Sequence, residues 1–364
     1  MSAGKAIDPA LHAFESGSKP LPSPTTSSAN PSASLPALWG YLQPALDHII
    51  HSPTKNLTEA PSIEVSYHIG LHTAVYDYFM SQSESGGTTA TRALLPIPSR
   101  RSDANQLGGT DLYAQLDQYY AEAAKDILYG APPDDSTLIP YLLPRFSRYT
   151  TGAQSVNRLL GYVNRHYVER AVEEDKGWLR PADFFDLVAE SIQEDDTRDT
   201  IQRHLQERRT EELKKWGYYD GASTAVLAQA EACAEAASPL DRIVPLSSLA
   251  HRRFRSEVID PLLAVPKPEN EVIDPLLAVP KPENDMKMKK KKKKKKPTAP
   301  PEKPAVQGSR LSRAVNTLLE GENCDAGEKR RLAGELAILL RTVGVRFDHS
   351  LQKKLDKFIL QNAT

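Results

Sequence analysis

Two histidines on a predicted helix have the spacing of a pair of zinc ligands. His68 and His72 are four residues apart, so their imidazoles would share one helical face, as in a metal-binding helix. The residues between them, Ile69, Gly70 and Leu71, include no glutamate that could act as a general base, and no third ligand is evident nearby. We therefore interpret these histidines as part of a partner-facing surface, and we expect no metal.

The rest of the chain offers no recognisable catalytic machinery. The sequence contains no GxSxG nucleophile elbow, no phosphate-binding GxxxxGK[ST] loop and no dinucleotide-binding GxGxxG turn. Cys233 and Cys324 are the only cysteines, and neither has a CxxC partner or a nearby helix start that would indicate a thiol nucleophile. We expect a protein that is not an enzyme and that uses no cofactor or small-molecule substrate.

Composition describes a protein of ordinary hydrophobicity. Of the 364 residues 40% are hydrophobic, and the formal net charge of −1 indicates no general affinity for nucleic acid. No apolar run reaches the roughly 18–20 residues needed to cross a bilayer. The first residues lack the basic start and apolar core of a secretion signal. Two cysteines provide no disulfide framework, which suits a reducing compartment, so we expect cytoplasmic and nuclear localisation.

The strongest helical pattern lies between 146 and 170. From Gln154 onward we predict one amphipathic helix with two apolar stripes, whereas a surface helix needs only one. The first stripe consists of Val156, Leu160, Val163 and Tyr167, and the second of Ser155, Leu159, Tyr162 and His166. Two interpretations fit this pattern: a helix buried on two sides, or a helix that packs one stripe inward and offers the other to a partner protein.

Apolar residues at helical spacing predict further helices along the chain. The helix at 63–81 has an inward stripe and a second stripe that contains Ile69, His72 and Tyr76. Sparse apolar spacing between 179 and 241 predicts long, partly exposed helices. The remaining predicted helices lie at 37–51, at 112–128, at 136–147 and in three segments of 309–360.

The stretch YVNRHYVERAVEEDKGW at 162–178 resembles a segment of the cullin family, the scaffolds of multi-subunit ubiquitin ligases. The order of the predicted helices agrees, because LWGYLQPALDHII, LHTAVYDYF and LYAQLDQYYAEAAKDIL resemble successive helices of the family's first repeat. This resemblance implies an all-α fold of cullin-repeat helical bundles, with one five-helix repeat and the start of a second.

The resemblance also implies a division of the chain into four parts. The first part is rich in serine and proline and cannot bury enough apolar surface to fold. The four expected parts are a disordered tail at 1–35, a first cullin repeat at 36–265 with a helical insertion at about 179–241, a linker at 266–308, and the start of a second repeat at 309–364.

In cullins of SCF-type ligases, the second and fifth helices of the first repeat dock a small adaptor that carries an F-box substrate receptor. The resemblance therefore implies an adaptor-binding surface in this chain. Its residues would be His68, Ile69, His72 and Tyr76 of the second helix, and Ser155, Leu159, Tyr162 and His166 of the fifth. The family's C-terminal half, which binds the RING subunit, has no counterpart here, so we expect a truncated, partial scaffold that does not bind that subunit.

The linker supports an alternative function. The segment EVIDPLLAVPKPEN occurs at 257–270 and again at 271–284, and eight consecutive lysines follow at 289–296. The lysines repel one another, which favours a solvated linker, but the alternative is a helical protein whose lysine run binds RNA or an acidic membrane. No aromatic residue flanks the lysines to stack on bases. Salt-dependent binding that is lost on deletion of 287–296 would favour the alternative.

Overall fold

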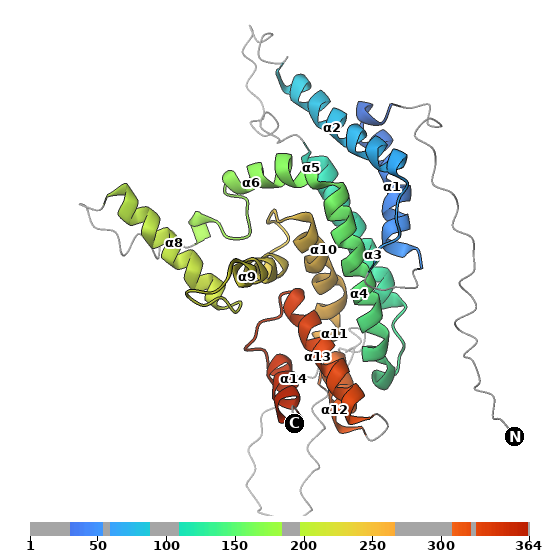
Figure 1. Ribbon diagram of the computed structural model, residues 1–364, viewed down its shortest axis with the longest axis vertical. Helices are drawn as coiled ribbons and strands as arrows, with labels where there is room; N and C mark the ends of the chain where they lie inside the picture. Colours follow the sequence, from blue (N-terminus) through green and yellow to red (C-terminus); the bar gives the residue numbers. More distant parts are fainter. Residues whose placement is uncertain are drawn as a thin grey trace, which may run out of the picture.

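The computed structural model describes residues 30–53, 59–87, 109–183, 197–265, 308–321 and 325–362. Every regular element in these ranges is helical, which confirms the all-α prediction (Figure 1). The helices are α1 (Leu35–His51), α2 (Val65–Gly87), α3 (Thr110–Tyr129), α4 (Asp135–Leu159), α5 (Gly161–Val163), α6 (Glu169–Glu173), α8 (Arg198–Lys214), α9 (Thr224–Ala237), α10 (Leu246–Phe254), α11 (Asp260–Leu263), α12 (Arg310–Glu320), α13 (Ala326–Thr342) and α14 (Ser350–Gln361). None of the described helices combines the length and hydropathy that a membrane span requires.

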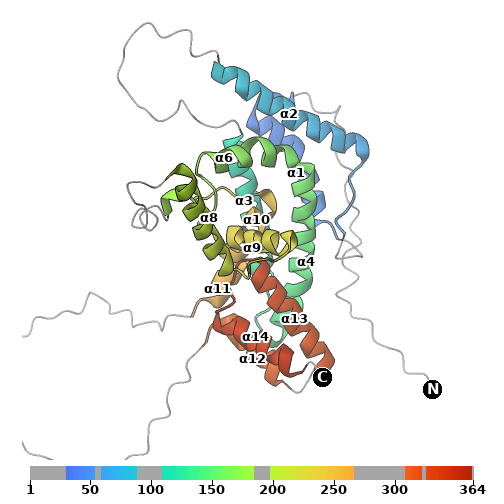
Figure 2. The same ribbon diagram turned by 60° about the vertical axis from the view of Figure 1, so that its left-hand side comes forward.

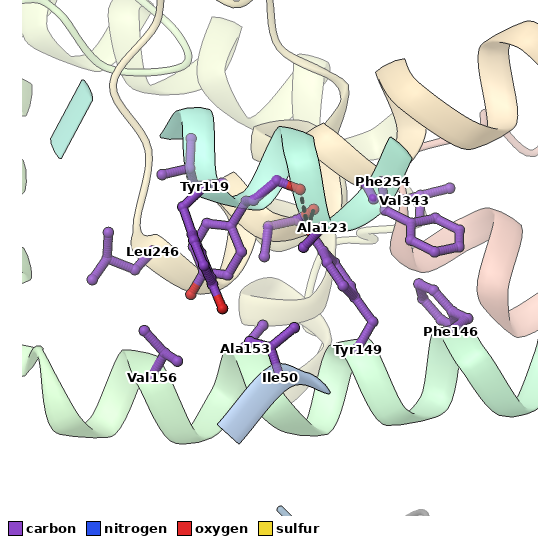
Figure 3. Close-up of a cluster of buried hydrophobic side chains, with 14 of the residues drawn as sticks. Ile50, Tyr119, Ala123, Phe146, Tyr149, Ala153, Val156, Leu246, Phe254 and Val343 are labelled. Carbon is purple, nitrogen blue, oxygen red and sulfur yellow. Dashed lines mark hydrogen bonds between the residues drawn. The ribbon is translucent and has the colours of Figure 1, made fainter. Parts of the chain in front are cut away.

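One hydrophobic cluster joins helices from distant parts of the sequence. Helices α12 and α13 pack against α4, and α10 packs against α3, α4 and α9. At its centre Phe254 packs on Phe146 and Tyr149, with ring centroids 4.9 and 5.4 Å apart (Figure 3). The Tyr149 hydroxyl lies 3.2 Å from the carbonyl oxygen of Tyr120 and 3.1 Å from that of Ala250. The helices after 309 thus share a core with the earlier ones, and the division into two repeats stays a prediction.

The predicted gap between a helix at 136–147 and a second one starting near Gln154 is wrong. Helix α4 is continuous over this region and contains Pro140 and Pro144, although each proline removes an intrahelical hydrogen bond. Close packing explains the continuity, because a Cβ atom on Gly152 would lie only 2.7 Å from Cδ1 of Ile50 in α1. The apolar face that α4 buries along this contact stabilises the helix past its prolines.

The single helix predicted from Gln154 to Arg170 is also wrong. Helix α4 ends at Leu159, and Leu160 adopts φ −101° and ψ 29°, outside the helical range. The chain then forms α5, a π-helical turn named η4 (Asn164–Val168) and α6, all directed away from the axis of α4 (Figures 1 and 2). The two stripes expected on one helix therefore belong to elements of different direction.

The expected disorder of residues 1–35 is wrong at its C-terminal end. The 3₁₀ turn η2 (Pro31–Ala33) packs against α1 and α2. The side chain of Asn30 caps this turn by accepting a hydrogen bond of 3.1 Å from the Ser32 amide, and Ser81 Oγ on α2 donates to the Ser32 carbonyl at 3.3 Å. Residues 1–29 lie outside the described residues.

The predicted insertion contains α8 and α9, which differ in how they pack. Helix α8 buries only Leu213 and carries ion pairs on its exposed surface, whereas α9 packs against α10 and α13 through small side chains. Gly344, at φ 78°, allows this approach, because a Cβ there would lie 2.7 Å from the Cys233 carbonyl oxygen. Residues 184–196 and 266–307, with the second copy of the duplicated segment and the lysine run, lie outside the described residues.

Candidate partner-docking site

Two tyrosines fix the inward face of α2 and so define which face points outward. Tyr67 donates a 2.8 Å hydrogen bond to the carbonyl of Tyr41 on α1, and the two rings meet edge to face. Burial and then the neighbouring Tyr41 raise the pKa of Tyr67 to about 12. Tyr78 donates to the carboxylate of Asp111 on α3, and burial together with this hydrogen bond raises its pKa. Helix α2 is therefore held in one orientation on α1 and α3.

The outward face of α2 carries a line of apolar side chains, which we call the α2 stripe. Val65 is 73% exposed, Ile69 59%, Tyr76 43% and Met80 42%, and exposed His72 lies in the same line. Their positions i, i+4, i+7, i+11 and i+15 place them on one helical face. Soluble proteins seldom leave a contiguous apolar patch in water unless it meets a partner, so the stripe is the leading candidate interaction surface.

The chain after the bend at Leu160 extends this surface with aromatic rings. The Tyr162 ring lies 5.3 Å from Phe79, 5.4 Å from Tyr76 and 6.4 Å from His72, measured between ring centroids. On its other side it stacks on the His166 ring at 3.9 Å. We call these five side chains the aromatic cluster. Edge-to-face contacts of this kind are favourable and hold Tyr162 in a defined position between α2 and η4.

Asn164, which precedes Arg165 and His166, has a structural role. Asn164 Nδ2 donates to Asn157 Oδ1 at 2.7 Å, while its Oδ1 accepts from the Leu246 amide at the start of α10 at 3.1 Å. Tyr167 is buried with its ring centroid 5.1 Å from that of Tyr113. These contacts tie η4 to α3 and α10, which leaves Arg165 exposed and His166 on the surface side.

The structure brings together some of the residues predicted for the site and separates others. His72, Tyr76, Tyr162 and His166 meet in the aromatic cluster, and His68 and Ile69 are exposed one turn earlier on α2. Ser155 and Leu159 belong to α4, on the other side of the bend at Leu160.

Leu159 is only 3% exposed, so the surface position expected for it is wrong; the end of α4 turns it into the core. Ser155 is half-buried and accepts a 3.0 Å hydrogen bond from Arg158 Nη2. That Ser155 and the six residues on α2, α5 and η4 bind an adaptor stays a prediction.

Sequence reasoning missed several members of this surface. Val65 and Met80 continue the α2 stripe by one step at each end, and their spacing was available as a signal. Phe79 reads as a core residue and is 5% exposed, yet its ring supports Tyr162. No local signal distinguishes its role from ordinary packing.

The electrostatics of the aromatic cluster favour a neutral histidine. Burial, followed by the positive charges of Arg170 and Arg165, lowers the pKa of His166, and Glu169 opposes this effect. At neutral pH the stacked imidazole is therefore uncharged. Among the described residues no group of three His, Cys, Asp or Glu side chains could hold a metal ion. The arrangement of rings and aliphatic side chains suits binding rather than catalysis.

The fold and this surface define an all-α protein with an exposed apolar and aromatic face. The chain is 23% identical to Cell division control protein 53 of Saccharomyces cerevisiae over 146 residues, which is 39% of this chain and 17% of that protein. It is 25% identical to Cullin-1 of Dictyostelium discoideum over 154 residues, 42% of this chain and 18% of that protein. The chain thus spans less than a fifth of the length of these relatives. No family model matches, and no solved structure matches. The similarity indicates a cullin-like chain.

Proposed function

We propose that this chain is a cullin-like scaffold that binds the adaptor and F-box receptor of an SCF-type ubiquitin ligase through the α2 stripe and the aromatic cluster. The proposal rests on the exposed apolar face of α2 from Val65 to Met80. Tyr162 of α5 contacts this face at Tyr76, and His166 of η4 stacks on Tyr162. The partial similarity to cullin-type relatives supports it. Cytoplasmic and nuclear localisation is part of the same proposal.

The energetics of the face agree with a docking role. Exposed aromatic and aliphatic anchors supply most of the binding free energy in protein interfaces, and truncation of one anchor typically costs about 1–3 kcal/mol. Tyr76 and Tyr162 hold each other at a ring distance of 5.4 Å, and Phe79 supports Tyr162 from the core. Side chains ordered before binding lose less entropy when a partner arrives. The scaffold itself performs no chemistry and positions the receptor module.

Binding of purified adaptor–F-box receptor complex to the full chain tests the proposal. Ile69→Glu/Tyr76→Ala changes two exposed residues of the α2 stripe, and we expect affinity to fall by at least about 100-fold, which corresponds to roughly 2.7 kcal/mol. Leu159 is unsuitable for such a test because it is buried. The matched control is Ile338→Glu/Tyr129→Ala, at positions that are 62% and 78% exposed on other helices.

Isothermal titration calorimetry measures the affinities, and circular dichroism verifies that all three proteins are equally helical. Binding by the parent and by the control, with loss in the stripe variant, supports the scaffold and its face. No binding by a folded parent, or equal binding by the stripe variant, contradicts the proposal.

A further inference from the structure

Two arginines next to the aromatic cluster have no anionic partner. Arg165 and Arg170 are exposed, and among the described residues neither forms an ion pair or a side-chain hydrogen bond. Several other arginines are paired, such as Arg253 with Asp117 and Arg313 with Asp135, the latter through a 2.8 Å contact. We call Arg165 and Arg170 the cationic edge.

The cationic edge lies beside the ring that ends the aromatic cluster. Arg165 precedes His166, whose ring stacks on Tyr162, and Arg170 follows at the start of α6. Both guanidinium groups are close enough to lower the pKa of His166, and the carboxylate of Glu169 opposes this effect. Glu169, Glu173, Glu174 and Asp175 follow in the same segment, but among the described residues none of them forms an ion pair with Arg165 or Arg170, so both guanidinium groups remain available to the carboxylates of another molecule.

We propose that the partner docked on the α2 stripe is a folded protein that presents carboxylates to the cationic edge, so that an apolar contact and an acidic contact form together. This inference rests on the proposed docking function. Guanidinium groups bind carboxylates with two parallel hydrogen bonds, which adds geometric selectivity to the apolar contact. Charges at the rim of an interface chiefly raise the association rate and make binding dependent on salt.

Charge reversal at the edge tests the inference with the full chain and the purified adaptor–F-box receptor complex as the probe. We expect Arg165→Glu/Arg170→Glu to weaken binding by at least tenfold at 50 mM NaCl. We also expect the parent's affinity to fall between 50 and 300 mM NaCl, where charge screening increases, and the variant's affinity to change less. The matched control is Arg198→Glu/Arg330→Glu, which reverses two exposed arginines without ion pairs on α8 and α13.

The outcomes separate the two proposals. If charge reversal leaves affinity unchanged while Ile69→Glu/Tyr76→Ala abolishes binding, the docking function stands and the acidic partner surface is wrong. If the reversal and the Arg198→Glu/Arg330→Glu control weaken binding equally, the effect is general repulsion and the inference also fails. If the folded parent does not bind at all, the docking function fails and this inference fails with it.

A second measurement detects the partner's carboxylates directly. Arg165→Lys/Arg170→Lys keeps both charges and introduces amines that a zero-length carbodiimide joins to carboxylates in contact, with formation of an amide. Mass spectrometry of the complex should show cross-links from the introduced amines to aspartate or glutamate of the partner. Arg198→Lys/Arg330→Lys should show none. A complex of parental affinity without such cross-links at either edge position overturns the inference.

Discussion

Two regions of the molecule use the same residue types in opposite environments. One is the exposed surface formed by the α2 stripe and the aromatic cluster, and the other is the packed region around α10. In the aromatic cluster His72 is exposed, and the ring of His166 stacks on that of Tyr162. On α10, His251 is buried with its ring centroid 6.3 Å from that of Phe146 on α4, and neither of its ring nitrogens has a hydrogen-bond partner among the described residues. Histidine therefore lies on an exposed aromatic surface in one region and occupies a desolvated core position in the other.

The arginines show the same contrast. Arg252 on α10 is 2% exposed, and its Nη1 donates to the carbonyl oxygens of Pro239 and Arg242 at 3.0 and 2.7 Å. Arg165 and Arg170 have no such partners within the part of the chain that the structure describes. Interior charges must be paired because desolvation is costly, whereas charges left unpaired in water remain available to another molecule. The same residue type therefore stabilises the fold where its polar groups are bonded within the chain, and is free to contact another molecule where they are not.

The largest expected effect comes from the buried ion pair between α3 and α10. Asp117 accepts from Arg253 Nε at 2.6 Å and also contacts Nη2, and both side chains are mostly buried. Asp117→Ala should lower the free energy of unfolding by about 3 kcal/mol, because a mostly buried guanidinium loses the closer of its two carboxylates and keeps only Glu257, at 3.5 Å. Urea denaturation measures this change. Asp77→Ala, on the exposed side of α2, should change stability by less than about 0.5 kcal/mol, and equal effects would remove the distinction between the two regions.

A pH-dependent effect of somewhat smaller size comes from His251. Burial lowers its pKa to about 4 from an ordinary value of 6.5, so the folded state favours the neutral ring. As pH falls from 6.5 to 4, the unfolded chain takes up a proton that the folded chain refuses, and stability is lost, by up to about 3 kcal/mol. His251→Leu removes this loss, so its stability relative to the parent should rise as pH falls through that window in urea titrations.

Glu235, on α9 where that helix meets α10, gives a control of opposite sign. It accepts a 2.6 Å hydrogen bond from Ser248, and burial raises its pKa to about 7 from 4.5. The folded state therefore keeps the proton between pH 4.5 and 7, and the parent loses stability as pH rises. Glu235→Gln should gain stability relative to the parent as pH rises, whereas His251→Leu gains as pH falls. Parallel curves for both variants would contradict the assigned environments.

The smallest effect is expected at the cationic edge. Arg165→Ala/Arg170→Ala removes two unpaired surface charges, so the free energy of unfolding should change by less than about 0.5 kcal/mol. Chemical denaturation measures this. A loss comparable to that of Asp117→Ala would show that these arginines hold the fold together, and the contrast between the two regions would then disappear.

Local signals allowed much of the helical order to be predicted. The expected helix at 112–128 matches α3, which Gly109 precedes at φ 96° and Gly130 follows before two prolines. At the bend the local signal is Gly161, directly after Leu160, and the direction of the chain beyond it is held by a remote contact, because the side chain of Asn164 accepts from the amide of Leu246, 82 positions away. The apolar spacing therefore identified the rings of Tyr162 and His166 but wrongly placed Leu159 on the same surface.

Residue type alone also could not reveal which ionisable groups are buried. Glu235 on α9 is desolvated where α9 packs on α10, and His251 on α10 lies against Phe146 of α4, so the burial of both depends on contacts between helices. Conversely, the absence of ion pairs at Arg165 and Arg170 follows from the three-dimensional placement of every nearby carboxylate. Such properties depend on contacts between distant segments, which periodicity does not encode.

The packing of α12 and α13 on α4 has a consequence for synthesis on the ribosome. Arg313 and Asp135, which join α12 to the start of α4, are 178 residues apart in the chain. The nascent chain therefore completes α4 long before the helices that cover it leave the exit tunnel. During that interval an apolar face of α4 is open to water, and uncovered surfaces of this kind attract chaperones or aggregate. Folding of this core thus depends on helices that are translated about 178 residues after the start of α4.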